Sequence, residues 1–364
     1  MRIRGPAAAL IVTAALGAAV VGWPAPQATA ADPLKIAFVY VAPIGDAGWT
    51  YQHELGRRQL QAALAGKVKT SYVENVPEGA DSERVIRQLA ADGNQLIFTT
   101  SFGYMEPTLK VAKQFPKVKF EHATGYKRAA NVATYSARFY EGRYLAGIIA
   151  GRMTKSNVIG YVAAFPIPEV VQGIDAFTQG ARSVNPKVQV KLVWTASWYD
   201  PGKEKEATDT LISQGADLVT NHTDSTAVVQ AAEEKGVYSI AYNSNMAKFG
   251  PKTELSGVTM QWGDYYIKEA KAVLDGTWKS HDVWGGIGNG MIRMAPFNAV
   301  VPQSVRDEVA AKQAAIAGGT FHPFQGPIKD QSGAVKVAAG SKLTDAQILK
   351  LDWLVEGVQG QLPK

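Results

Sequence analysis

Two aromatic loops are the segments of this chain best suited to hold a ligand. Trp49 lies in GDAGWT, after the apolar run KIAFVYV, and Phe102 and Tyr104 follow a second apolar run, QLIFTTS. In an open α/β sheet the ligand crevice lies at the carboxyl ends of the strands, where such loops are found. Because stacking of a base on an aromatic ring is worth roughly 1–3 kcal/mol, the pattern favours a site for a flat solute. We expect Trp49 and Phe102 to enclose it, and Tyr104 to pack within its own half.

Polar side chains at other strand ends are candidates for contacting the edge of that solute. Asp46 either contacts the ligand or caps the helix that follows, and the same two alternatives apply to Asp224. Asn243 offers a donor beside an acceptor, as an amide does when it pairs with the edge of adenine. Trp198 lies in the second half of the chain, where it would close the site from the opposite side. The expected ligand-binding residues are Trp49, Phe102, Asp46, Glu121, Trp198, Asp224, Asn243 and Trp262.

Motifs for other chemistry are missing from the sequence. It has no G-x-S-x-G, no P-loop and no H-E-x-x-H, and its five histidines lack ligand spacing. The absence of cysteine excludes disulfides and thiolate chemistry. We therefore expect no catalytic residue, no metal site and no cofactor. An exported nucleosidase that uses His122, Asp224 or Glu121 remains the enzymatic alternative.

The elements that must position these residues alternate between strand and helix. Predicted strands at 35–41, 68–76, 95–101, 118–124 and 131–137 are separated by helical patterns, which is typical of βαβ units around a parallel sheet. A long helix at 139–155 starts a second series of similar size, so we predict an α/β fold of two βαβ lobes. We expect the chain to cross between them near 145–150, 243–262 and 285–300, which makes a hinge of several strands. The expected parts are a first lobe of 31–146 plus about 263–290, a second lobe of 147–262 plus about 291–330, and a C-terminal tail of 331–364.

The first thirty residues have the pattern of a secretory signal peptide. Arg2 and Arg4 precede an apolar run, and Ala28 to Ala30 form a cleavage site of the A-x-A type, so the mature chain is expected to begin at Ala31. Without a cysteine for lipid attachment, the mature protein is expected to be free in the periplasm. The formal net charge of +6 is scattered among acidic residues, so we expect no nucleic-acid partner.

Four segments together resemble the basic membrane protein family, the PnrA-like purine nucleoside receptors of ABC importers. They are GDAGWTYQHELG, FYEGRYLAGIIAG, YDPGKEKEATDTLISQGADLV and VLDGTWKS, and the likeness runs from about Leu34 to Pro296. The resemblance implies the periplasmic binding protein fold, with two α/β lobes joined by a three-strand hinge. It also implies a purine ligand, a membrane permease as partner, and a monomer.

The sequence departs from the family pattern at the ligand. Receptors for nucleosides hold the ribose with an aspartate at a strand end, where this chain has Asn243, and more often carry Phe where this chain has Trp49. The chain also resembles a subgroup that binds adenine. The expected ligand is therefore a purine nucleobase, adenine first, with a nucleoside receptor or a carrier for a signalling receptor as alternatives. Replacement of Trp49 by Ala is expected to weaken binding at least about tenfold and to leave the fold stable.

Overall fold

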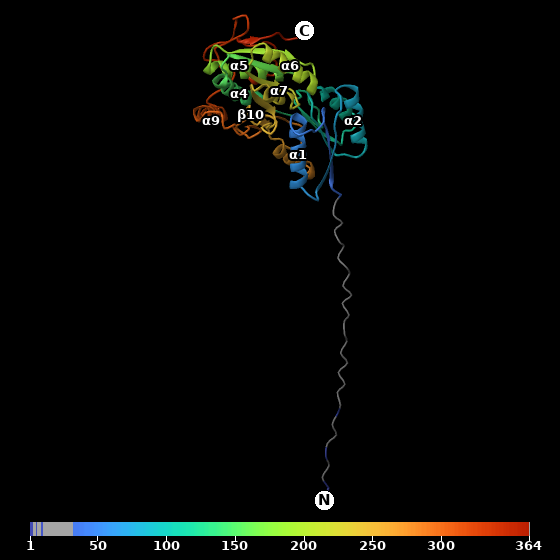
Figure 1. The fold of residues 1–364 in the computed structure, drawn as a ribbon. Coiled ribbons are helices and arrows are strands. Elements are labelled where there is room, and N and C mark those ends of the chain that lie inside the picture. The colour runs from blue at the N-terminus through green and yellow to red at the C-terminus, as the bar shows by residue number, and fades with distance from the viewer. Residues whose placement is uncertain (3–4, 6–8, 10–31, 364) are drawn as a thin grey trace. The chain divides into compact units, whose positions relative to one another are not determined.

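The computed structural model describes residues 1, 2, 5, 9 and 32–363. Its contacts divide the chain into two units, Met1–Asp32 and Pro33–Lys364, and the second unit contains the fold described below (Figure 1). The predicted signal peptide at 1–30 lies almost entirely outside the described residues. In the part of the chain that is described, no helix is long and apolar enough to cross a membrane.

The first lobe is a six-stranded parallel sheet with helices on both faces. Its strands, in the order β2-β1-β3-β4-β5-β11, are β2 (Val68–Val73), β1 (Leu34–Val39), β3 (Leu96–Thr99), β4 (Lys119–Ala123), β5 (Val132–Ala137) and β11 (Asp282–Gly285). Its helices are α1 (Trp49–Ala63), α2 (Ala80–Ala91), α3 (Met105–Ala112) and α8 (Gly263–Leu274), with a 3₁₀ turn at Phe102–Tyr104.

The side chains of β1 point alternately to the two faces of this sheet, and they explain why helices cover both faces. Phe38 belongs to one buried cluster with Leu60 of α1, whereas Ala37 and Val39 belong to another cluster with Ile86 of α2. Successive side chains of a strand point to opposite faces, so a strand that is apolar at every position needs cover on both sides. Figure 1 shows α1 and α2 on either side of the first strands.

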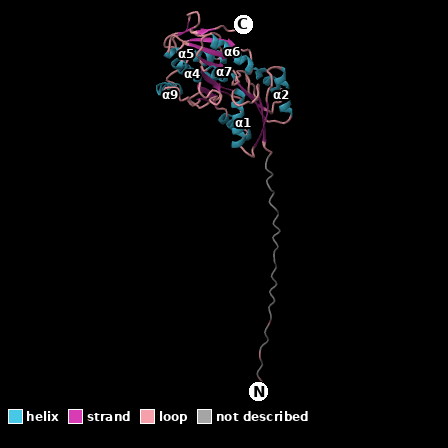
Figure 2. Cartoon of the chain, viewed as in Figure 1, coloured by secondary structure: helices cyan, strands magenta, loops and turns pink. Residues whose placement is uncertain are grey.

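The second lobe is a seven-stranded sheet. Its strands, in the order β12-β10-β9-β8-β6-β7-β15, are β12 (Ile292–Met294), β10 (Glu254–Met260), β9 (Tyr238–Asn243), β8 (Leu218–His222), β6 (Val158–Ala163), β7 (Gln189–Trp194) and β15 (Val358–Gln359). Only β12 runs antiparallel to its neighbour. The accompanying helices are α4 (Phe139–Met153), α5 (Pro168–Val184), α6 (Pro201–Ser213), α7 (Ala227–Lys235), α9 (Gln303–Ala317) and α10 (Asp345–Ile348), and Figure 2 shows the helices packed around the strands. A ribbon of β13 (Ile328–Lys329) and β14 (Val335–Val337) lies between α9 and α10 in the sequence.

Both sheets repeat one strand order. The order β2-β1-β3-β4-β5 of the first lobe recurs as β7-β6-β8-β9-β10 in the second. In each lobe the second strand in the sequence lies on one side of the first strand, and the third, fourth and fifth strands lie on its other side. Ligands bind outside the carboxyl ends of the strands at such a switch point, so each lobe offers one half of a site.

The chain passes between the sheets three times: after β5, between β10 and α8, and between β11 and β12. We propose that these passages form the hinge. The first lies closer to Arg138 than the expected 145–150, because those residues belong to the middle of α4. That helix packs tightly on α5: a Cβ added at Gly147 would lie 2.0 Å from the carbonyl oxygen of Phe177.

The expected C-terminal tail, 331–364, also differs from the structure. Val358 and Gln359 pair in parallel with Val190 and Lys191 of β7, which places β15 at the edge of the second sheet. Val337 pairs with Ile328 in the β13–β14 ribbon. This segment therefore completes the second lobe. Its short, polar strands gave little periodic signal in the sequence.

Candidate ligand-binding site

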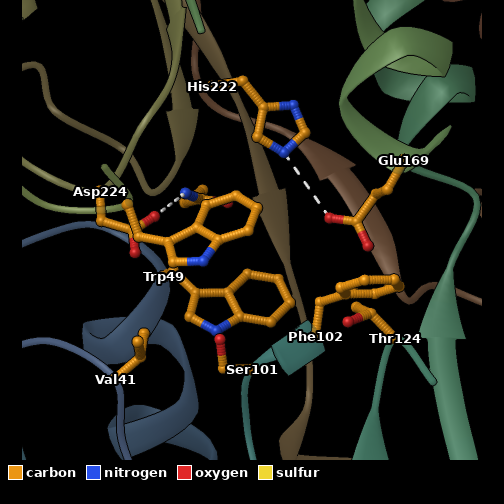
Figure 3. Close-up of a pocket in the computed structure, with 10 residues that line it drawn as sticks. Val41, Trp49, Ser101, Phe102, Thr124, Glu169, His222 and Asp224 are labelled. Atoms are coloured by element: carbon orange, nitrogen blue, oxygen red, sulfur yellow. Dashed lines mark hydrogen bonds and ion pairs between the residues drawn. The ribbon is translucent and has the colours of Figure 1, made fainter. Parts of the chain in front are cut away.

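A cavity with an empty volume of about 330 Å³ lies at the carboxyl ends of strands from both sheets (Figure 3). Its first-lobe residues follow β1, β3 and β4, and its second-lobe residues follow or end β6, β7, β8 and β9. The lining consists of Val41, Trp49, Ser101, Phe102, Thr124, Glu169, Trp198, His222, Asp224 and Asn243. Aromatic side chains from both lobes are among the lining residues, so the cavity suits a flat molecule.

Three aromatic side chains line this cavity. Trp49 donates its indole N–H to the carbonyl oxygen of Thr100 over 2.6 Å, which fixes the ring at the end of β3. Phe102 is half-buried in the loop after β3, and Figure 3 shows it beside Thr124 and below Glu169. Trp198 enters from the second lobe, with its ring edge-on to Phe165 at 5.0 Å between centroids. The rings leave a hydrophobic slot with fixed walls.

Asp224 and Asn243 form a polar pair in the cavity wall. Asn243 Nδ2 donates to Asp224 Oδ1 over 3.1 Å, whereas the buried Asn243 Oδ1 has no hydrogen-bond partner among the described residues. Burial, together with nearby carboxyl groups, raises the pKa of Asp224 well above its ordinary value. A protonated carboxyl both donates and accepts, so the pair can offer a donor and acceptors to a ligand.

Glu169 and His222 form a second pair in the cavity wall. Glu169 Oε1 lies 3.6 Å from His222 Nε2, as Figure 3 shows by a dashed line. Burial raises the pKa of Glu169 to about 8. Burial, with the positive charge of Arg143 behind it, lowers the pKa of His222 well below its ordinary value. These shifts favour the uncharged form of both groups at neutral pH.

Backbone geometry at the cavity is unusual at two strand ends. Asn243 has φ 70° and Thr124 has φ 61°, both in the left-handed region. Asparagine tolerates this region, but for a β-branched residue such as threonine it is strained. Strained residues of this kind concentrate at ligand sites, where the surrounding structure holds them.

The two lobes touch beside the cavity, so the structure has its lobes closed on one another. Ser244 Oγ accepts from the N–H of Gly48 over 2.9 Å and lies 3.1 Å from the Gly48 carbonyl oxygen, to which it donates. Gly48 has φ 102°, and a Cβ added there would lie 2.0 Å from the carbonyl oxygen of Asp224. Trp198 Nε1 also donates to Glu78 Oε1 of the first lobe over 3.2 Å.

The structure brings together five of the eight residues predicted from the sequence. These are Trp49, Phe102, Trp198, Asp224 and Asn243. The alternative of a helix cap does not hold for Asp224, because Thr226 precedes α7 at the cap position. Tyr104 packs within its own lobe, with its hydroxyl donating to the carbonyl oxygen of Val76 over 2.5 Å.

Three predicted residues do not line the cavity. Asp46 neither caps α1, whose cap residue is Gly48, nor enters the cavity; its side chain is 76% exposed and lies 3.7 Å from Lys248 Nζ. Glu121 is buried in the first lobe, where it accepts from Tyr265 and Trp278, and burial raises its pKa to about 8. Trp262 lies behind Trp49, edge-on to it at 5.7 Å, and supports the wall from the core. Being near a strand end did not distinguish residues that face the cleft from residues that face the lobe interior.

Five lining residues were not among those predicted: Val41, Ser101, Thr124, Glu169 and His222. Glu169 follows β6 in the segment AFPIPE, at the switch point of the second sheet. The strand-end rule that found Phe102 in the first lobe would have found Glu169 in the second. His222 ends β8 and is likewise a strand-end residue.

The sequence matches known proteins over most of its length. Residues 34–321 match the family model described as ABC transporter substrate-binding protein PnrA-like. The chain is 52% identical over 337 residues to a purine-binding protein of Brucella abortus (strain 2308), covering 93% of this chain and 96% of that one. It is 37% identical over 332 residues to a Haloferax volcanii protein provisionally described as an ABC transporter glucose-binding protein, covering 91% of this chain and 82% of that one.

Solved structures with the same fold have diverse roles. A solute-binding protein of an ABC transporter from Aeropyrum pernix K1 superposes with a TM-score of 0.69 at 20% identity, covering 82% of this chain and 93% of that one. A transcriptional activator of the comK gene from Bacillus halodurans superposes with a TM-score of 0.67 at 24% identity, covering 79% of this chain and 99% of that one. These likenesses show the two-lobed α/β fold of solute-binding proteins, while the evidence for the family comes from the sequence. The chain belongs to the basic membrane protein family, the PnrA-like substrate-binding proteins of ABC transporters.

Proposed function

We propose that this protein binds a purine nucleobase, with adenine favoured, between its two lobes and delivers it to the permease of an ABC importer. The observation that carries the proposal is the aromatic slot with the Asp224–Asn243 pair at its wall. The 52% identity to a purine-binding protein supports the class of ligand.

The polar lining supports adenine among the purines. Adenine presents an exocyclic amine beside a ring nitrogen, that is, a donor beside an acceptor. Asn243 Oδ1 is an acceptor without a hydrogen-bond partner among the described residues, and a protonated Asp224 is a donor. The two side chains can therefore match both groups on that edge.

The carboxyl groups of the cavity support a base over a nucleoside. A nucleoside adds a nonplanar ribose with several hydroxyl groups, which need both space and polar partners. Carboxylates suit such hydroxyls as acceptors, but burial disfavours the ionised forms of both Glu169 and Asp224. The ribose would therefore lack strong acceptors in this site.

The remaining parts of the proposal follow from the family and from the sequence. The protein acts outside the cytoplasm after removal of its signal peptide near Ala30, works as a monomer and carries out no reaction on its ligand. Closure of the lobes around the ligand is its mechanism: the ligand contacts both halves and so stabilises the closed state. The permease then recognises this state.

The test is calorimetric titration of protein that has been unfolded, stripped of ligand and refolded, with adenine, adenosine, guanine and glucose in parallel. We expect tight binding of adenine and much weaker binding of the other three. Tighter binding of adenosine than of adenine would show that the ligand is a nucleoside. Tight binding of glucose, the sugar in the description of the Haloferax relative, would remove purines altogether. Release of adenine from adenosine during incubation would show an enzyme.

A further inference from the structure

A cluster of buried acceptor atoms lies in the first lobe, outside the ligand cavity. Glu121 of β4, Glu269 of α8 and His281, directly before β11, each place one possible ligand atom within 4.8 Å of the others. Glu121 is 0% exposed and Glu269 is 2% exposed, whereas the His281 side chain is 28% exposed. These residues are distant in sequence, which is why a search for histidine spacing found no site.

The hydrogen bonds that His281 and Tyr265 make leave His281 Nε2 without a hydrogen-bond donor. His281 Nδ1 lies 2.8 Å from the carbonyl oxygen of Lys279, which can only accept, so Nδ1 donates to it and Nε2 is the nitrogen that faces the cluster. Tyr265 has a single hydroxyl proton and gives it to Glu121 Oε2 over 2.6 Å. The Tyr265 hydroxyl therefore cannot also donate to His281 Nε2, which is 3.2 Å away.

Glu269 supplies the second observation that points to a ligand. Its buried Oε1 has no hydrogen-bond partner among the described residues and lies 3.4 Å from His281 Nε2. The nearest cation is Lys268 Nζ, at 3.3 Å on a side chain that is 70% exposed. His281 Nε2 and a buried Glu269 oxygen therefore face one another, with the exposed ammonium of Lys268 as the neighbouring cation. A buried carboxylate is stabilised when it is paired in this way or binds a metal.

We propose that Glu121, Glu269 and His281 bind a divalent transition-metal ion of the zinc class. Two carboxylate oxygens and one imidazole nitrogen form a donor set that such ions accept, with a water as fourth ligand. Binding of the ion would release the proton that burial favours on Glu121. Bonds of about 2.0–2.2 Å at tetrahedral angles separate two donors by about 3.4 Å, which agrees with the His281–Glu269 separation. The partly exposed side of His281 gives the ion a path from solvent.

Neighbouring groups already hold the three side chains in place by hydrogen bonds, as they do around ligands in metal sites. Trp278 Nε1 donates to Glu121 Oε1 over 2.7 Å, Tyr265 donates to the other oxygen, and Lys279 fixes the tautomer of His281. Each Glu121 oxygen keeps a second lone pair for the ion. Because α8 and His281 lie between the second and third passages of the chain, an ion here would tie that connection to the first sheet.

The test is titration of the full chain, first stripped with a chelator and dialysed, with Zn²⁺ against a chromogenic chelator of known affinity. We expect one Zn²⁺ per chain, and we expect Glu269→Gln and His281→Asn each to weaken binding at least about a hundredfold. Lys268→Met should tighten binding, because it removes the cation that competes for Glu269. Glu106→Gln changes an exposed carboxylate of the same lobe and should leave zinc binding unchanged. Co²⁺ in place of Zn²⁺ should give the visible absorption of a tetrahedral site, which provides a second readout on the unaltered chain.

Two results would overturn the proposal. Absence of Zn²⁺ binding by the parent chain at neutral pH would show that the cluster is not a metal site. Binding by Glu269→Gln and His281→Asn that equals the parent's would place an adventitious ion elsewhere. Adenine affinity is measured in each variant and should not change, so failure of the metal site and failure of the proposed function are separate outcomes.

Discussion

Trp198 of the second lobe donates its indole N–H to the Glu78 carboxylate of the first lobe over 3.2 Å. The same oxygen of Glu78 accepts from Ser101 Oγ over 2.5 Å and from the N–H of Gly103 over 2.8 Å. The Glu78 carboxylate thus binds both the loop that carries Phe102 and the Trp198 ring of the opposite lobe. Closure of the lobes completes this arrangement.

Glu78→Ala should therefore weaken adenine binding by about tenfold, because hydrogen bonds to a charged group are worth about 1.5–3 kcal/mol and this one is partly exposed to solvent. The loss should come mainly from faster dissociation, measured by stopped-flow displacement. Glu106→Ala, which removes an exposed carboxylate of the same lobe, is the control. An unchanged dissociation rate in Glu78→Ala would mean that the contact does not hold the closed state.

Phe102→Ala should reduce adenine affinity at least about tenfold, since stacking contributes roughly 1–3 kcal/mol per ring. Thermal stability should change little, because Phe102 is half-buried and lies in a loop. Tyr72→Ala, an exposed aromatic away from the cavity, should bind adenine as the parent does. Equal affinity in Phe102→Ala and the parent would remove this ring from the site.

Trp49→Ala should differ from Phe102→Ala in its effect on the fold. Trp49 is 9% exposed and packs edge-on against His53 and Trp262, so its truncation should destabilise the fold by about 3–5 kcal/mol as well as weaken binding. The expectation from the sequence that the fold stays stable is thereby revised. Chemical denaturation in urea, beside calorimetry, measures the two effects separately.

Asp224→Asn should bind adenine within a few-fold of the parent at neutral pH, because an amide replaces a protonated carboxyl with the same shape and with both a donor and acceptors. Asp224→Ala should lose at least about tenfold, since it leaves Asn243 and the ligand edge without a partner. A large loss in Asp224→Asn as well would show that the carboxylate binds in its ionised form. Calorimetry on both variants decides the matter.

Adenine affinity should fall as the pH rises through about 8. Glu169 has its pKa raised to about 8, so it is neutral below that pH and places a charge in the cavity above it. Glu169→Gln should make affinity independent of pH between 6 and 9. The folded pKa exceeds the ordinary value of 4.5, so the folded state holds more protons between these limits, and the contribution of Glu169 to stability declines as pH rises across that window. A Glu169→Gln profile that still falls near pH 8 would assign the effect to another group.

The strand-helix alternation and the two lobes were predictable because apolar periodicity is local in sequence. Trp49 and Phe102 were predictable for a related reason: each lies in the connection between a strand of a parallel sheet and the helix that follows it. Whether a strand-end side chain faces the cleft or the interior is decided by packing from distant segments, as when Tyr265 and Trp278 turn Glu121 inward. Glu269 and His281 joined Glu121 only through the return of the chain to the first lobe, which no spacing rule describes.

The repeated strand order of the two sheets gives the halves of the molecule one architecture but different chemical tasks. The first lobe contributes the rings of Trp49 and Phe102, whereas the second contributes the ring of Trp198 together with Glu169, His222, Asp224 and Asn243. All the ionisable side chains that line the cavity thus come from one half of the molecule. Substitutions at the strand ends of the second lobe can redirect such a receptor to another planar solute while its partner half stays as it is.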